Sequence, residues 1–353
     1  METAVSLRAE LRTEPGAEAS HHKRLGIAQH DAEYALFAGI YCLDRFLIAP
    51  FEECRAVTTK NRMLGRSARW KAASLGLSLR ASLRASLGVS ALLSLAPGHV
   101  AAQGKLEAQY EATLAGIPVG RGAWNIDINE DSYGAAAVGG TTGLLKTIAN
   151  GSGTGEAQGR VISGALVPFA YKASTTTSKK HEAIHINLAN GNVKDFGIVP
   201  EPPVDADRVP VTDAHKKGVL DPMTASLLRV PGTGEVLSPE ACRAGAAVFD
   251  GRMRYDLKLD FKRMETVKAE KGYHGPVVVC AIYFTPISGY IPDRPVIRYL
   301  SGQRNIEIAF APILGTRVLV PFRMKIPTPL GTAMLEATQF LTKAVPPHVA
   351  KTQ

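Results

Sequence analysis

The sequence predicts a mainly β fold: an antiparallel curved sheet, or a partly closed β-barrel or sandwich, with a few short helices. From Leu106 onward, apolar and polar residues alternate with the period of two that a half-buried strand requires. Gly, Pro and Asn turn signals separate these runs at short intervals. Long segments with helical periodicity are few, which favours strands folded into one antiparallel sheet.

The chain begins with 62 residues that we do not assign to this fold. Their apolar run over residues 34–51 contains Asp44 and Arg45 near its middle, and two such charges make a membrane span unfavourable. We interpret residues 1–62 as upstream of a translation start at Met63. A genuine N-terminal extension is the alternative.

Residues 63–102 have the three parts of a secretory signal peptide. An apolar stretch over residues 85–96 follows a basic region, and Val100, Ala101 and Ala102 precede a predicted cleavage before Gln103. The basic region contains Arg66, Arg69, Lys71, Arg80 and Arg84. We therefore expect export to the periplasm, and a single mature β domain over residues 103–353 with no stable transmembrane span.

Charge does not indicate a nucleic-acid partner. Of the formal net charge of +9, residues 1–103 carry 13 Lys and Arg against 9 Asp and Glu, and the remainder carries 28 against 23. In the mature part the basic residues are dispersed rather than arranged in a stripe that could follow a phosphate backbone.

The first half of the mature chain contains the clearest strand patterns. Residues 106–114, 122–129, 132–138, 164–171 and 175–188 have strand composition. Asn190 and Gly191 predict a type I′ hairpin that leads into residues 193–198. Residues 143–148 suggest one or two helical turns. The glycine-rich residues 151–159 lack the motifs of a phosphate-binding loop, and we expect a flexible connection there.

His181, Glu182 and His185 match the HExxH pattern of zinc proteases, which requires a helix to bring both histidines to one metal. The surrounding residues favour a strand, on which four residues span roughly 13 Å. Two ligands of one zinc ion lie about 4 Å apart. We therefore expect no metal here, and two polar histidines on the solvent face of a strand.

The middle of the chain contains structural signals. Proline-rich residues 200–210 predict an extended linker. Asp221 and Pro222 predict the start of a short helix, because an aspartate accepts from free backbone N–H groups and proline fits the first turn. Ser238 and Pro239 repeat this pattern before residues 241–246.

The last third continues as strands, with an Asp250-Gly251 turn and a hairpin bend at residues 270–273. Strand composition covers residues 247–257, 257–261, 265–269, 276–284, 305–311 and 316–326. Cys242 and Cys280 are the two cysteines of the mature part. In an oxidising compartment we expect a disulfide between them, worth about 4 kcal/mol in the chain-entropy description. A catalytic cysteine is the alternative.

Several arginines of this region are candidates for binding an anion or another ligand. They would act by bidentate hydrogen bonds if they converged in a concavity of the sheet. The candidates are Arg252, Arg254, Arg298, Arg304 and Arg317. The alternative is that they point outward and pair with Asp250, Asp256, Asp260, Asp293 and Glu307.

The ordered succession of GIPVGRG, DPMTASLL, VFDGRMRYDLKL, GYHGPVVVCAIYFTPISGY and LGTRVLVPFRMKIPTPLG resembles an uncharacterised bacterial envelope family, domain of unknown function 3108, in its alphaproteobacterial form. The resemblance covers nearly all of residues 106–340. It implies an exported, mostly antiparallel β protein, and it supplies no catalytic residue.

Three functional classes remain. We expect a non-catalytic protein that binds an apolar or amphipathic envelope component, such as a lipid, without a cofactor. A structural or partner-binding module of envelope assembly is the first alternative. A metal-dependent hydrolase is the second, based on His181, Glu182 and His185 or on the region of Asp250, and it requires titratable groups that converge in one pocket.

Overall fold

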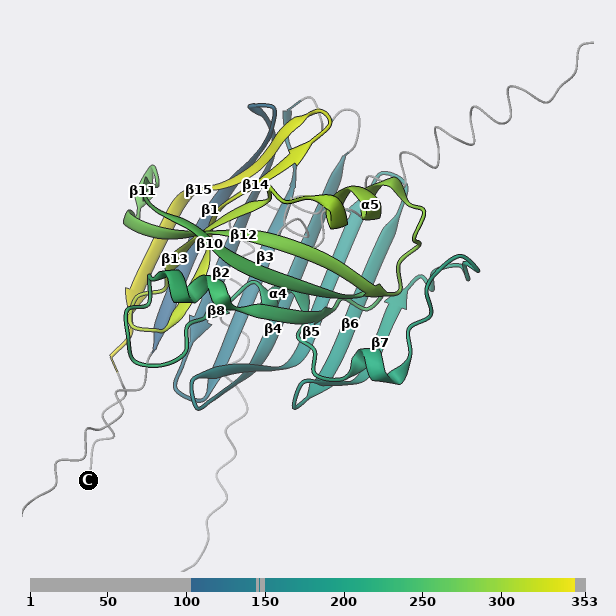
Figure 1. Ribbon diagram of the computed structural model, residues 1–353, viewed down its shortest axis with the longest axis horizontal. Coiled ribbons are helices and arrows are strands. Elements are labelled where there is room, and N and C mark those ends of the chain that lie inside the picture. The colour runs from purple at the N-terminus through teal and green to yellow at the C-terminus, as the bar shows by residue number, and fades with distance from the viewer. Residues whose placement is uncertain (1–102, 144–145, 147–149, 347–353) are drawn as a thin grey trace, which may run out of the picture. The chain divides into compact units, whose positions relative to one another are not determined.

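The computed structural model describes residues 103–143, 146 and 150–346 (Figure 1). The predicted leader and signal peptide lie outside the described residues, as does most of the helical turn expected over residues 143–148. Strands make up 61% of the described residues, and all fifteen belong to one sheet that is not closed. The predicted mainly β, antiparallel fold is confirmed.

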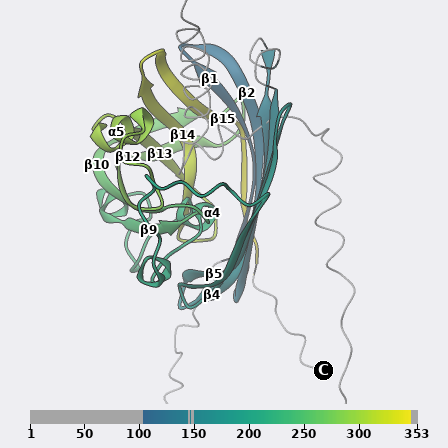
Figure 2. The same ribbon diagram turned by 90° about the vertical axis from the view of Figure 1, so that its right-hand side faces the viewer.

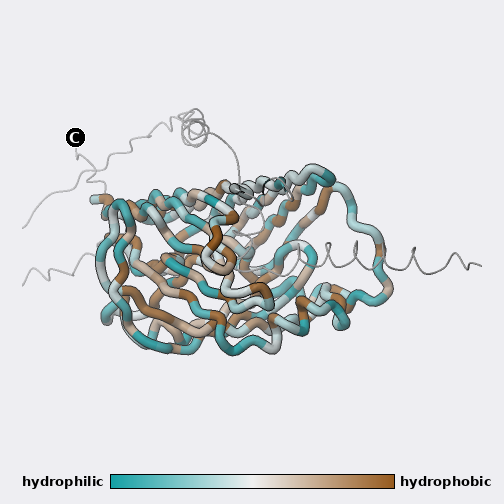
Figure 3. Tube along the Cα trace, turned by 90° about the horizontal axis from the view of Figure 1, so that it is seen from above, coloured by the Kyte–Doolittle hydropathy of each residue, from teal (hydrophilic) through white to brown (hydrophobic). Residues whose placement is uncertain are grey.

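Seven strands form the first half of the sheet, each antiparallel to the next. They are β1 (Gly104–Leu114), β2 (Ile117–Ile128), β3 (Ser132–Thr141), β4 (Gly151–Ile162), β5 (Ala165–Thr177), β6 (His181–Ala189) and β7 (Asn192–Val199). Buried and more exposed side chains alternate along most of them, and Figure 3 shows the corresponding alternation of hydropathy. Asn190 and Gly191 have φ of 50° and 73°, as the predicted hairpin requires.

β4 contradicts the prediction of a flexible connection over residues 151–159. The segment is a strand that pairs with β3 on one side and β5 on the other. Because the segment is rich in glycine, its sequence lacks the alternation of apolar and polar residues that predicts a strand. Its glycines nevertheless have a packing role. A Cβ at Gly159 would lie 2.3 Å from Cε1 of Tyr133, so only a glycine lets these two strands take their positions here.

The second half begins with short elements and continues as long strands. The short elements are η1 (Asp213–Lys216), α4 (Pro222–Ala225), β8 (Leu228–Arg229), η2 (Pro239–Arg243) and β9 (Gly245–Phe249). The remaining elements are β10 (Arg254–Lys268), β11 (Lys271–Gly272), β12 (His274–Ser288), α5 (Pro295–Gly302), β13 (Glu307–Pro312), β14 (Val318–Thr328) and β15 (Gly331–Ala344). Asp221 caps α4 as predicted, since its side chain accepts from the backbone N–H groups of Met223 and Thr224.

The last strand, β15, lies between β1 and β14, so the two ends of the domain are neighbours in the sheet. From β15 the order continues through β14, β13, β12 and β10 to β9. These strands turn away from β1–β7 and form a second layer opposite them, with α4 between the layers (Figure 2). At the tip of the long β10–β12 hairpin, β11 pairs in parallel with β15.

The hydrophobic core contains residues of both layers. The large sheet contributes mostly small and aromatic side chains, among them Ala135, Ala157 and Tyr171. The second layer contributes Tyr255, Phe322 and Phe340, which are each 0% exposed. Buried apolar area of this extent is the main source of stability in such a domain.

Candidate functional site

The HExxH residues lie on β6, and the strand separates their functional groups. Glu182 points to the inner face together with buried Ile184, whereas His181 and His185 occupy alternate positions on the other face. His181 Nδ1 lies 2.9 Å from Thr176 Oγ1, and His185 Nε2 lies 3.1 Å from Asp195 Oδ2. The glutamate therefore cannot serve as the base beside a metal held by these histidines. Among the described residues, no group of three or more metal-ligating side chains is found.

Glu182 instead forms a buried ion pair with Arg252 from the turn between β9 and β10. Arg252 Nη2 donates to Glu182 Oε2 at 2.5 Å, and the two side chains are 8% and 3% exposed. Lys180 Nζ lies 2.8 Å from the same carboxylate oxygen. At Gly251, φ is +93°, and an added Cβ would lie 2.9 Å from Ile184 Cγ2. The turn thus packs directly on the inner face of β6.

Asp250 shapes this turn from within. Its Oδ1 accepts from the backbone N–H of Arg252 at 2.7 Å and of Met253 at 2.6 Å. Asp250 is fully buried, and burial raises the pKa of its carboxyl group, while these N–H groups and the charges of Arg252 and Arg208 act in the opposite direction. Its Oδ2 is buried without a hydrogen-bond partner in the described part of the chain.

Arg254 starts β10, one turn after Asp250. Its Nη2 lies 2.8 Å from Asp256 Oδ1, and its side chain is 13% exposed. Arg254 pairs across the strands with Ser288, the last residue of β12, which is fully buried. Both Arg254 Nη1 and Ser288 Oγ are buried without a partner among residues 103–346 as described.

The linker over residues 200–210, here called the strap, runs to the end of β12. The backbone N–H of Val209 donates to the carbonyl of Tyr290, and that of Gly289 donates to the carbonyl of Val209, each at 2.8 Å. Arg208 Nη1 donates to the carbonyl of Gly289. These bonds hold the strap beside Ser288.

The other candidate arginines do not join this cluster. Arg298 pairs with Asp293, and both side chains are exposed. Arg304 donates to the carbonyls of Ser301 and Gln303, with its guanidinium 5.7 Å from the ring centre of Tyr283. Arg317 donates to three backbone carbonyls, those of Val230, Pro231 and Gly234, and so fixes the loop before η2.

A second buried polar group connects the large sheet to α4. Asp221 Oδ2 accepts from Thr224 Oγ1 at 2.6 Å, and Thr224 Oγ1 lies 2.7 Å from the hydroxyl group of Tyr133 on β3. Burial raises the pKa of Asp221 to about 6, although hydrogen bonds from Thr224 and Met223 favour its ionised form. Burial also raises the pKa of Tyr133.

Trp124 lies on the inner face of β2, between Ala108 of β1 and Ala137 of β3. The residue is 5% exposed, and its Nε1 has no hydrogen-bond partner within the described residues. Thr175 on β5 is 6% exposed, and its Oγ1 is also unpartnered there. The inner face therefore carries polar atoms whose hydrogen bonds are incomplete.

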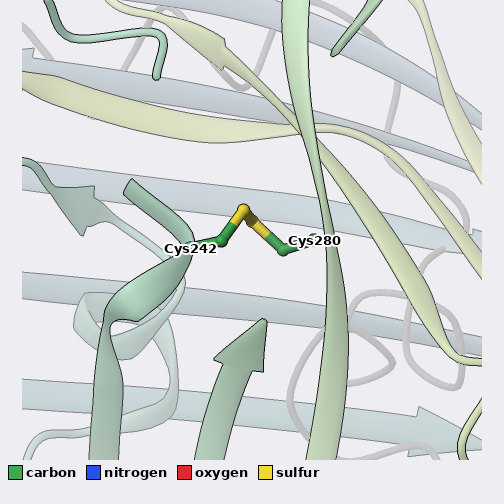
Figure 4. The surroundings of a disulfide bond; sticks show 2 residues. All are labelled: Cys242 and Cys280. Carbon is green, nitrogen blue, oxygen red and sulfur yellow. A yellow bond between two sulfur atoms is a disulfide. The ribbon is translucent and has the colours of Figure 1, made fainter. Parts of the chain in front are cut away.

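Cys242 of η2 and Cys280 of β12 form a disulfide, with Cα atoms 5.5 Å apart (Figure 4). Both residues are fully buried, and the bond fastens η2 to the second layer. A thiol nucleophile is therefore not present at either position.

Residues 109–338 match the family described as Protein of unknown function (DUF3108). The chain belongs to this family. The DUF3108 match begins within β1 and ends within β15, so it includes both cysteines and every buried polar group described above. The narrower resemblance to the alphaproteobacterial form of DUF3108 stays a prediction.

The DUF3108 chain is also similar to a crystal structure of a beta-barrel-like protein of domain of unknown function DUF1849 from Brucella abortus. The identity is 10% and the TM-score is 0.39, over 68% of this chain and 98% of that one. No curated protein matches the sequence. In the described part of this DUF3108 chain, no helix is long and apolar enough to cross a membrane.

The sequence pattern of this DUF3108 domain pointed to Arg252 and Arg254 but not to Ser288, Arg208 or Thr224. A serine at the end of an apolar strand and an arginine in a proline-rich linker have no distinctive signal. Their positions depend on the strap and the turn meeting at Gly289. That contact could be found only in the folded chain.

Proposed function

We propose that the protein is exported and acts as a non-catalytic binding protein that holds an apolar or amphipathic envelope component, such as a lipid, between its two layers. The observation that carries this proposal is the buried inner face of the large sheet. On that face, Trp124 Nε1 and Thr175 Oγ1 have no hydrogen-bond partner among the described residues, and the cross-strand neighbours of Trp124 are the small residues Ala108 and Ala137.

A buried donor without a partner costs about 1–3 kcal/mol. An acceptor atom on a ligand beside Trp124 would remove that cost, and the small side chains of Ala108 and Ala137 flank the ring on the neighbouring strands. Trp124 thus supplies both an apolar surface and one directional hydrogen bond.

The export part of the proposal is supported by the signal-peptide pattern and the buried disulfide. Disulfides between cysteines far apart in sequence persist mainly in oxidising compartments, such as the periplasm. Cys242 and Cys280 are 38 positions apart and meet in the core of the fold.

The test uses the full chain with Trp70→Phe, so that Trp124 is the sole tryptophan of the sequence. Titration with palmitate should change the emission of Trp124 in a saturable way, and native mass spectrometry should detect the complex. Ala137→Leu fills the inner face beside Trp124 and should abolish the change. Ala136→Leu, its neighbour on the other face of β3, is the matched control and should preserve it. An unchanged emission spectrum with palmitate and with a phospholipid would refute interlayer binding.

A second candidate function is binding of a partner polypeptide at β7. Among the described strands β7 pairs only with β6, and Phe196 and Val199 on it are 37% and 62% exposed. An exposed strand edge can accept an added strand. A photo-reactive residue at Val199 should then crosslink to one polypeptide in cells, whereas the same residue at Val204, beyond the strand, should not.

A further inference from the structure

Three buried polar atoms without a described partner belong to residues around the β9–β10 turn. They are Asp250 Oδ2, Arg254 Nη1 and Ser288 Oγ. Asp250 and Ser288 are each 0% exposed. A single incomplete hydrogen bond is common in a protein core, but three in adjoining residues require a shared explanation.

The register places these residues together. Arg254 is the cross-strand partner of Ser288 on β12 and of Phe249, the residue before Asp250, on β9. The backbone N–H of Asp250 donates to the carbonyl of Met253 and closes the turn. A Cβ at Gly289 would lie 1.8 Å from the carbonyl oxygen of Arg252, so the end of β12 touches the turn directly.

Two of the three atoms have the chemistry of an anion site. Arg254 Nη1 and the Ser288 hydroxyl group are donors on neighbouring strands, and the positively charged guanidinium of Arg254 pairs through Nη2 with Asp256. Burial raises the pKa of Asp250, while the backbone N–H groups of Met253 and Arg252 act in the opposite direction. The positively charged Arg208 and Arg252 act on the same carboxyl group.

The strap is hydrogen-bonded to the chain directly after Ser288. Its residue Val209 exchanges backbone hydrogen bonds with Gly289 and Tyr290, immediately after Ser288. In the middle of the strap, Asp205 Oδ2 lies 4.0 Å from Arg294 Nη2. Asp250 and Ser288 are each 0% exposed, so hydrogen bonds to a group bound beside them would be little weakened by water.

We propose that Arg254 and Ser288 form a buried site for an oxyanion, a carboxylate or phosphate group, beside the β9–β10 turn. This site does not depend on a ligand between the layers, because it involves the turn, the end of β12 and the strap. Two donors on paired residues of adjacent strands fit one oxyanion better than a cation or an apolar group.

The full-length protein should bind inorganic phosphate or acetate when isothermal titration is performed against a sodium chloride background of equal ionic strength. Ser288→Ala should weaken that binding about tenfold, the factor that corresponds to one hydrogen bond to a charged group. Arg254→Gln should weaken it at least as much. Arg304→Gln removes the same charge from an exposed arginine and should leave the affinity unchanged.

A variant could bind the anion poorly because it is misfolded. Thermal unfolding is therefore a second measurement of the proposed site. Phosphate stabilises many proteins by exclusion from their surface, and that effect acts equally on wild type and variant. In chloride, Ser288→Ala should unfold at the same or a higher temperature, because a buried hydroxyl group without a partner has been removed. In phosphate or acetate, the variant should gain less than the wild type.

The two anions distinguish the chemical source of the group. Stabilisation by phosphate alone identifies a phosphate site, by acetate alone a carboxylate site, and by both a general oxyanion site. Failure of both anions to bind the wild type would overturn the proposal, since it would leave a buried water as the partner of these atoms. Equal binding by wild type, Ser288→Ala and Arg254→Gln would overturn it too. Neither result would affect the palmitate titration reported by Trp124.

Discussion

Arg252 Nη2 lies 2.5 Å from Glu182 Oε2, and this ion pair joins the β9–β10 turn of the second layer to β6 of the first. The residues are 70 positions apart, and each belongs to a motif that suggested a different chemistry. Glu182 was the candidate base of a zinc site, and Arg252 was a candidate anion contact. In the fold, each supplies the countercharge of the other.

Removing one partner of this pair should destabilise the fold strongly, since it leaves a buried charge uncompensated. We expect Glu182→Gln to lower the free energy of unfolding by about 3 kcal/mol, measured by urea denaturation. Arg252→Met should cost less, because Lys180 still lies 2.8 Å from Glu182. Arg121→Gln breaks a pair whose arginine is 72% exposed and should cost under about 1 kcal/mol. Equal losses in the buried and the exposed pair would contradict this account.

Asp221 should make the protein less stable as pH rises between about 4 and 6. Its carboxyl group has a pKa of about 6 in the fold against 3.8 ordinarily, so the folded state holds more protons than the unfolded state in this window. The contribution is fully present below pH 4 and is lost as the pH passes 6, a change of about 3 kcal/mol.

Asp221→Asn should flatten this part of the pH profile. Asparagine still caps α4 through its carbonyl oxygen, and its amide can donate to Thr224, whose hydroxyl group then donates to Tyr133. Urea denaturation at several pH values from 4 to 7 gives the comparison. Wild type and variant with the same slope would show that another group controls this range.

Replacement by alanine should destabilise the protein at one of two glycines on neighbouring strands and have little effect at the other. Gly159→Ala brings a Cβ within 2.4 Å of the carbonyl oxygen of Val167 and 2.3 Å of the Tyr133 ring, and we expect a loss of at least about 2 kcal/mol. Gly134→Ala meets no atom within 4 Å and should change the free energy of unfolding by under about 0.5 kcal/mol. Thermal unfolding of the two variants tests this, and a tolerated Gly159→Ala would argue against the close packing of β4.

Loss of the disulfide should destabilise the protein by about 4 kcal/mol, from the 38-residue separation of Cys242 and Cys280. The comparison is best made in a Cys42→Ala, Cys54→Ala background, where the bridge is the sole oxidisable pair. Replacing Cys242 and Cys280 by alanine should abolish the response of the unfolding transition to reductant. A response that persists in the cysteine-free chain would have a different origin.

Local sequence patterns predicted the strands and turns of this fold, but not the contacts between segments that are far apart in the sequence. Alternation identified strands, and Asn190 with Gly191 identified a hairpin, because neighbouring residues determine both. β4 was missed because its glycines hide the alternation. The site around Ser288 was missed because a strap, a turn and a strand end converge there from separate parts of the chain. The packing of Gly289 against Arg252 and the hydrogen bonds of Val209 to Gly289 and Tyr290 bring them together.

The position of β15 has a consequence for a chain that emerges amino terminus first. β1 to β7 can pair in order as they appear, but one edge of β1 stays open until residues 331–344 arrive, more than 200 residues later. During that interval an unprotected edge and an uncovered apolar face would be exposed together, the conditions under which strands aggregate. A holding chaperone should therefore matter most for this protein before its last strand is released.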